Sequence, residues 1–126
     1  MTEDELSYEI IGAAIEVHRE LGGPGLIEDI YEEALQAELE LRGFKVRRQL
    51  GMRVQYKGKY LKKRLVLDML VEDLVIVENK AVDEHHSIFE AKLLTYLRLT
   101  HKRLGLVINF GEERVKDGIH RVVNKL

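Results

Sequence analysis

The spacing of apolar and polar residues predicts two helices at the start of the chain. Between residues 4 and 21, apolar side chains recur every three or four positions, which places them on one face of a helix. The glycine-rich segment 22–25 then interrupts this pattern. A second helix is expected from about residue 26 to residue 42, and Gly43 is suited to end it.

After residue 43 the apolar period changes to two, which is typical of half-buried strands. The alternation predicts one strand over residues 44–50 and a second over 52–56, with Gly51 interrupting them. Within the first strand, Arg48 is expected on one face and Gln49 on the other, because successive side chains of a strand alternate.

Two strongly apolar runs follow a turn at residues 57–59, one at 65–71 and the other at 74–77. The acidic pair Glu72-Asp73 is expected to join them, and continuously apolar strands of this kind belong in the middle of a sheet. A third helix over about 86–101 and a buried strand over 104–110 complete the core.

The tail from residue 115 to 123 fits either an edge strand or a short helix. The expected order is therefore α-α-β-β-β-β-α-β followed by a strand or helix, which is an α/β fold with a mixed central sheet flanked by helices. The chain has no repeat and no linker, and its 126 residues suit one domain, residues 1–126.

Composition excludes several classes of function. The chain has no cysteine, so it forms neither disulfides nor cysteine-bound zinc sites, in agreement with a reducing cytoplasm. It has no apolar run of the ~20 residues that cross a bilayer, and its acidic start is unlike a signal peptide. We therefore expect a cytoplasmic protein with no membrane partner. Motifs for nucleoside-triphosphate hydrolysis, dinucleotide binding and serine esterase chemistry are absent.

Charge is strongly segregated along the chain, although the formal net charge is only −2. Residues 1–41 hold twelve acidic side chains and one basic one, whereas residues 42–64 hold ten basic side chains and no acidic one. The basic segment could bind a phosphate backbone, or it could simply face the acidic helices. The candidate nucleic-acid-binding residues in it are Arg47, Arg48, Arg53, Lys62, Lys63 and Arg64.

Asp68 is a carboxylate inside an otherwise apolar strand, where it must be paired, hydrogen-bonded or bound to a metal. If the following turn is centred on Asp73, then Asp68 stands opposite Glu78, and Lys80 points to the same face. Two adjacent carboxylates attract a divalent cation, and Mg²⁺ prefers oxygen ligands. With Lys80 beside them to orient water or stabilise charge, they suit phosphodiester hydrolysis.

A structural alternative exists for the same residues: Asp68 could form a salt bridge with Lys80, while Glu78 is solvated at a strand end. Two histidine sites also have plain structural explanations. His18 is expected to have an ordinary hydrogen-bond partner, and His85 and His86 are expected to be helix-start residues, because adjacent side chains there point in different directions.

The segment from Gly25 to Tyr31 fits the pattern G-x-x-E-x-x-Y, and residues 8–124 as a whole resemble the GxxExxY protein family. The resemblance continues through residues 67–72, 76–82, 93–98 and 105–111. That family is grouped with the PD-(D/E)xK nuclease-like superfamily, so the resemblance implies a restriction-endonuclease-like fold.

By this resemblance, Asp68 is the motif aspartate and Glu78 and Lys80 form the E-x-K pair. The backbone carbonyl of Asn79 would be a further metal ligand. Glu28 would be the acidic residue on the first core helix near the metal, which would be Mg²⁺ or Mn²⁺. Without the resemblance, Glu28 could simply favour a helix N-terminus electrostatically.

The resemblance also concerns the third helix. Tyr96 matches the tyrosine of a Q-x-x-x-Y pattern, and Lys92 occupies the glutamine position, where it would contact phosphate. The alternative for both Tyr31 and Tyr96 is a core position with the hydroxyl hydrogen-bonded at the edge.

The function expected from these residues is metal-dependent hydrolysis of nucleic-acid phosphodiesters, with DNA favoured over RNA. The alternative is a catalytically inactive nucleic-acid-binding or protein-interaction module on the same fold. In a chain of this length, sequence specificity would require a partner or a homodimer.

Overall fold

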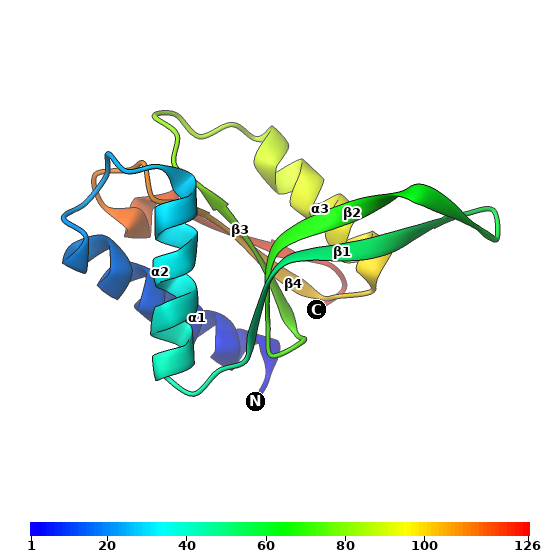
Figure 1. Ribbon diagram of the computed structural model, residues 1–126, viewed down its shortest axis with the longest axis horizontal. Coiled ribbons are helices and arrows are strands. Elements are labelled where there is room, and N and C mark those ends of the chain that lie inside the picture. Colours follow the sequence, from blue (N-terminus) through cyan, green and yellow to red (C-terminus); the bar gives the residue numbers. More distant parts are fainter.

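The fold is a five-stranded mixed sheet between helices, as described for all 126 residues by a computed structural model (Figure 1). The strands lie in the order β1-β2-β3-β4-β5, and all neighbours are antiparallel except β3 and β4. The elements are α1 (Glu3–Glu20), α2 (Glu28–Leu41), β1 (Val46–Tyr56), β2 (Lys59–Val71), β3 (Val75–Lys80), α3 (Ile88–Thr100), β4 (Leu104–Asn109), η1 (Val115–Gly118) and β5 (Ile119–Val123). The predicted fold class is confirmed.

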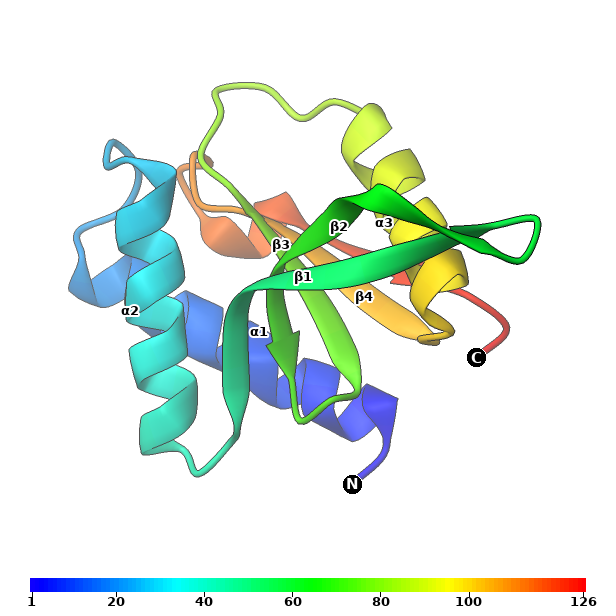
Figure 2. The ribbon, with the colours of Figure 1, turned by 45° about the vertical axis from the view of Figure 1, so that its right-hand side comes forward.

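Helices cover both faces of the sheet (Figure 2). The apolar sides of α1 and α2 pack on one face, where 17 buried residues form the larger core cluster. Leu93 and Leu97 of α3 pack on the other face, in a cluster of six buried residues. Because each buried leucine contributes roughly 2 kcal/mol relative to an exposed one, these two clusters hold the sheet rigidly between its helices.

The structure departs from the predicted elements at Gly51 and at the tail. Gly51 pairs with Val66 inside an unbroken β1, so three strands precede α3 rather than four. A glycine weakens a strand but leaves the backbone hydrogen bonds available, which explains why the pattern alone suggested a break. The undecided tail forms both elements, the short 3₁₀ helix η1 and the edge strand β5, which pairs with β4.

The outer part of the β1–β2 hairpin projects from the body of the protein (Figure 1). We call residues 53–64 the arm. Lys57 and Gly58 at its tip have φ values of 49° and 80°, which suit a two-residue hairpin turn between paired Tyr56 and Lys59. Every arm residue except Val54 is exposed, so the arm contributes little to the core.

None of the helices combines the length and apolarity that a membrane-crossing segment requires.

Candidate active site

The register between β2 and β3 brings the two predicted carboxylates together. Met69 pairs with Val77, and the two pairs that follow toward the turn keep the same register. One step beyond Met69 and Val77, this register places Asp68 opposite Glu78. The turn residues Glu72 and Asp73 both have positive φ, as a tight hairpin turn requires. The register predicted from the turn is therefore confirmed.

Backbone pairing between β2 and β3 ends at Met69 and Val77, and beyond it the two strands are joined by hydrogen bonds from backbone amides to carboxylate side chains. The backbone N–H of Asp68 donates to Oε2 of Glu78 at 3.2 Å, and the N–H of Asn79 donates to Oδ2 of Asp68 at 3.0 Å. Each carboxylate is thus held by a backbone amide of the opposite strand. Because each has a second oxygen and further lone pairs, both can still bind a cation.

Burial makes this carboxylate pair electrostatically unfavourable without a cation. Glu78 is only 8% exposed. Burial first, and then the charge of Asp68, raises the pKa of Glu78 from its ordinary value of 4.5 to about 9. Two carboxylates are hard oxygen donors, so this pair fits Mg²⁺ or Mn²⁺, whose charge would remove the repulsion.

Lys80 completes the group in a pocket of about 160 Å³ between the sheet and α3. Its Nζ lies 4.7 Å from the centre of the Phe89 ring, and Lys80 forms no ion pair. The alternative of a salt bridge between Asp68 and Lys80 with a solvated Glu78 is therefore wrong. A lysine held against a ring face without a carboxylate partner is free to contact an anionic ligand.

Helix α3 supplies the other wall of this pocket. Lys92 and Tyr96 both line it, one helical turn apart, with Phe89 one turn earlier. Burial first, and then the charge of Glu78, raises the pKa of the Tyr96 hydroxyl. The two α3 residues that the resemblance singled out therefore line the pocket of the carboxylate pair, and Tyr96 is half-buried and also packs against the smaller core cluster.

Glu28 stands near the pair but does not join it as a third direct ligand. It is the first residue of α2 and is half-buried. Burial first, and then the charge of Asp68, raises the pKa of Glu28, which places the two carboxylates within electrostatic range. The oxygens of Glu28, Asp68 and Glu78 do not all lie within 4.8 Å of one another. Glu28 is therefore suited to act through a water or a second ion.

Tyr31 fixes the loop that leads into α2. Its ring is fully buried and stacks on Phe110 with centroids 4.8 Å apart. Its hydroxyl donates to the carbonyl of Gly23 at 2.7 Å and accepts from the N–H of Leu26 at 3.1 Å. The core position expected for Tyr31 is confirmed. Since Glu28 begins the same helix one turn earlier, this clamp also sets where Glu28 enters the site.

A model of the PD-(D/E)XK nuclease superfamily matches residues 4–122. The chain belongs to this superfamily. Its mixed sheet flanked by helices is accordingly a restriction-endonuclease-like α/β fold. Comparisons with curated proteins and with solved structures gave no match.

In the name PD-(D/E)XK, the letters stand for an aspartate, then an aspartate or glutamate, and then a lysine after one further residue. Three residues of the pocket occur in this order. Asp68 comes first, and Glu78 and Lys80 form the E-x-K triplet ten residues later. Asn79, between them, points to the opposite face of the sheet. Its side-chain Nδ2 donates to Oε1 of Glu32 at 3.2 Å.

Glu32 of α2 is the centre of a buried polar network that the sequence analysis missed. It is only 2% exposed, and its Oε2 accepts from Nε of Arg48 at 3.2 Å and from Nε2 of Gln49 at 3.1 Å. The signal was its position three residues before Leu35, on the buried side of α2. Through Asn79, this network supports the strand that bears Glu78 and Lys80.

Gln49 breaks the alternation that was predicted for β1. Arg48 and Gln49 were expected on opposite faces, yet both side chains bind Glu32. The reason is the φ of Gln49, which is 50° and turns its side chain toward α2. Its strand neighbours pair with Met69 and Leu67, so this strained residue lies beside Asp68.

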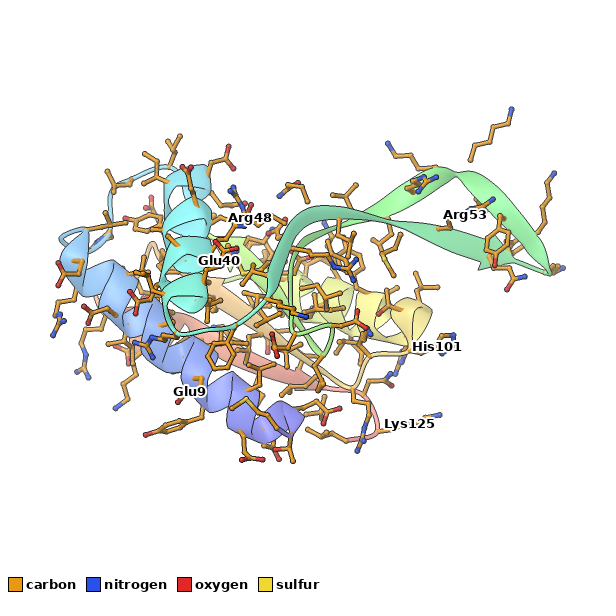
Figure 3. The ribbon with its side chains drawn as sticks, turned by 60° about the horizontal axis from the view of Figure 1, so that its bottom comes forward. Glu9, Glu40, Arg48, Arg53, His101 and Lys125 are labelled. Carbon is orange, nitrogen blue, oxygen red and sulfur yellow. The ribbon has the colours of Figure 1, made fainter.

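The basic residues predicted to bind nucleic acid divide into two groups. Arg47 pairs with Asp73 at 3.2 Å, and Arg48 pairs with the buried Glu32. The other four lie on the arm and form no ion pair: Arg53, Lys62, Lys63 and Arg64. Figure 3 shows Arg53 on the arm and Arg48 near α2. Arg48 thus faces the acidic helix α2, in line with the alternative that the basic segment packs against the acidic helices. The basic side chains of the arm have no acidic partner.

Three histidines were expected to have plain structural roles. Nε2 of His18 lies 3.1 Å from the carbonyl oxygen of Phe110, which confirms an ordinary hydrogen-bond partner. His86 Nδ1 accepts from the N–H of Ile88 at the start of α3, as expected for a helix-start residue. His85 also lies just before α3, where its Nε2 is 2.5 Å from Oε1 of Glu90 in the first turn, and its ring stacks on His120 of β5.

Replacement of Tyr31 by Phe should destabilise the fold. Tyr31→Phe removes two hydrogen bonds of the clamp and leaves the carbonyl of Gly23 without this donor, so we expect a loss of about 1–3 kcal/mol in the free energy of unfolding. Urea denaturation measures this loss. The control is Tyr8→Phe at a site that is 76% exposed, where we expect a change within ~0.5 kcal/mol. Equal stability of the two variants would contradict the clamp.

Removal of the Glu78 charge should stabilise the metal-free protein at alkaline pH. The folded state keeps the Glu78 proton up to about pH 9, whereas the unfolded chain releases it near 4.5, so wild-type stability falls as the pH rises between these values. In EDTA at about pH 8.5, we expect Glu78→Gln to raise the melting temperature by roughly 3–8 °C, and by much less near pH 4.5. The exposed Glu33→Gln variant is the control. If the difference in melting temperature between wild type and Glu78→Gln were the same at both pH values, the repulsion would be disproved.

Proposed function

We propose that this PD-(D/E)XK protein is a divalent-metal-dependent nuclease that hydrolyses phosphodiester bonds of DNA. The observation that carries the proposal is the pocket in which the half-buried Asp68 and the buried Glu78 adjoin Lys80, which forms no ion pair. Such a combination is costly for stability, and a site of this kind is a candidate for phosphoryl chemistry. We also propose membership of the GxxExxY family, on the match at Gly25, Glu28 and Tyr31.

Asp68, Glu78 and the backbone carbonyl of Asn79 would hold the Mg²⁺ or Mn²⁺ ion. When bound, such an ion polarises a phosphoryl oxygen and lowers the pKa of a water ligand. The backbone amides that donate to Asp68 and Glu78 fix both carboxylates in advance. This preorganisation means that the site needs little rearrangement to bind the ion.

Lys80 would place its ammonium group beside the attacking water and the charge that develops on the phosphate. Phe89 holds this ammonium at one side of the pocket without neutralising it. Lys92 and Tyr96 on the opposing helix would contact the phosphate oxygens, and Glu28 would orient the water from the side of α2. Lys80, Lys92 and Tyr96 line the same pocket as the carboxylate pair, and Glu28 lies outside its lining but within electrostatic range of Asp68.

The arm supports a nucleic-acid substrate because it continues the strand that bears Asp68. Strand β2 runs from the arm to the pocket, and its regular pairing with β1 from Arg64 to Leu67 places Arg64 on the face of Asp68 by the period of two. Lys62 lies in the part of the arm where the register between the two strands shifts. Arg53 lies directly opposite Arg64 across the hairpin. Like charges directly opposite each other destabilise a sheet, and a phosphate between them would remove this repulsion.

The shape of the arm favours DNA over RNA. The arm is a two-stranded ribbon, and the major groove of B-DNA, about 12 Å wide, admits such a ribbon. The major groove of A-form RNA is too narrow and deep for it. Six basic residues and no acidic residue on the arm would supply the affinity for the phosphate backbone.

Loss of either the acidic pair or the lysine should abolish metal-dependent cleavage. We expect the untagged protein to nick or cut supercoiled plasmid in Mg²⁺ or Mn²⁺ but not in EDTA. Asp68→Asn and Lys80→Ala should each lower the rate at least ~100-fold, since each removes a charged group that contacts the reacting phosphate or its metal. The rate of conversion on agarose gels measures this.

Two variants outside the pocket, Asp29→Asn and Lys116→Ala, change the same charges and should cleave at the wild-type rate. A chain that binds DNA equally in Mg²⁺ and EDTA without cleaving it would instead be an inactive binding module. A chain that neither cleaves nor binds DNA would favour a protein-interaction module.

The arm should account for much of the salt dependence of DNA binding. Each lost phosphate contact lowers the slope of log affinity against log salt concentration by roughly 0.9, so Lys62→Ala/Lys63→Ala should reduce its magnitude by about 1–2. Fluorescence anisotropy with a labelled duplex in Ca²⁺ or EDTA measures the slope. The charge-matched Arg114→Ala/Lys116→Ala variant, which alters the opposite end of the fold, should keep the wild-type slope. If both double variants reduce the slope equally, the arm is not the binding surface.

A further inference from the structure

Three side chains with metal-ligating atoms meet outside the acidic pair. His85 comes from the connection between β3 and α3, Glu90 from the first turn of α3, and His120 from β5. Nε2 of His85 lies 2.5 Å from Oε1 of Glu90, and the rings of His85 and His120 stack with centroids 3.7 Å apart. One ligand atom of each residue lies within 4.8 Å of the other two. No other group of three such residues in the protein is this compact.

Two ring nitrogens in this cluster are buried without a hydrogen-bond partner. They are Nδ1 of His85 and Nε2 of His120. A buried polar atom that lacks a partner costs roughly 1–3 kcal/mol, and native proteins seldom retain one without a reason. Nothing in the catalytic chemistry proposed above uses either histidine.

We propose that His85, Glu90 and His120 form a second metal site, which takes a transition-metal dication of the Zn²⁺ class. Two imidazoles and one carboxylate are the ligands of many zinc sites, whereas Mg²⁺ selects oxygen donors. The two sites therefore differ in the metal they prefer. Three protein ligands leave a fourth position for water or an anion.

The backbone around the three ligands is already fixed. Asn109 at the end of β4 binds both the N–H and the carbonyl of Val82, at 3.0 and 3.1 Å, three residues before His85. His120 is paired with Val107 in the sheet. The ligands of the site therefore sit on three elements whose relative positions the core determines.

Metal binding requires only side-chain movement. Ligand atoms of a tetrahedral zinc site lie roughly 3.4 Å apart, given zinc–nitrogen bonds of about 2.0–2.1 Å. The rings of His85 and His120 would rotate out of their stack, and the hydrogen bond between His85 and Glu90 would give way to bonds from both residues to the metal.

This second site adjoins one wall of the catalytic pocket. The ring of His85 meets the ring of Phe89 edge-on, with centroids 5.8 Å apart, and Phe89 in turn holds the Lys80 ammonium. A metal bound to His85 and Glu90 would therefore fasten the start of α3 without touching the substrate.

The test is Zn²⁺ binding to untagged, EDTA-stripped protein, measured by calorimetry, with Co²⁺ absorption as a spectroscopic probe. The background is the Asp68→Asn/Glu78→Gln variant, which removes the acidic pair so that this result does not depend on the nuclease proposal. We expect one saturable Zn²⁺ site, visible Co²⁺ bands of a four-coordinate complex, and no comparable affinity for Mg²⁺. His120→Ala and Glu90→Gln should each lower the Zn²⁺ affinity at least tenfold.

The matched control is His86→Ala, which removes the neighbouring histidine and should bind Zn²⁺ as well as the background variant does. Zn²⁺ should also raise the melting temperature of the background variant but not that of His120→Ala, whose metal-free melting curve shows whether it is folded. If His120→Ala does not fold, the comparison of Glu90→Gln with His86→Ala decides. The proposal is overturned if no saturable site exists, or if the cluster variants and His86→Ala bind Zn²⁺ equally.

Discussion

The placement of Asp68 beside Glu78 is the constraint on which the rest of the structure depends. Both carboxylates lie where the β2–β3 ladder stops, and each accepts a hydrogen bond from the backbone of the other strand. Their proximity raises the pKa of Glu78, and it persists because the surrounding core overdetermines the positions of both strands. Strand β3 contributes residues to the core clusters on both faces of the sheet, so Glu78 cannot move away from Asp68 without disturbing both layers.

Much of this arrangement could be predicted from the sequence, because it depends on local rules. A tight turn at Glu72 and Asp73 fixes the hairpin register, and the period of two then decides which side chains share a face. Asp68, Glu78 and Lys80 were found in this way. The same rules failed at Gly51, since a pattern of side chains cannot show whether the backbone hydrogen bonds of a glycine continue.

The features that sequence analysis missed depend on contacts between distant segments. Glu32 lies in a helix, and nothing local shows that Arg48 and Asn79 will surround it. Nothing local to Gln49 predicts its left-handed backbone, which turns its side chain toward Glu32. His85 and His120 are far apart in the chain and meet only because β5 pairs with β4 at the edge of the sheet. In each case, the tertiary structure overrides the local pattern.

Because β2 runs from the arm to Asp68, the length of the hairpin determines how far the basic side chains of the arm lie from this carboxylate. A strand rises about 3.3 Å per residue, so in the proposed complex the number of residues between Arg64 and Asp68 would set the distance between the phosphate at the arm and the phosphate at the carboxylate pair. Adding two residues to each strand would lengthen this span by roughly 7 Å and keep every side chain on its face. Adding one residue to each strand would turn the basic side chains of the arm to the opposite face of the ribbon. In the proposed complex, only insertions of an even number of residues in each strand would therefore keep Arg64 on the face of Asp68.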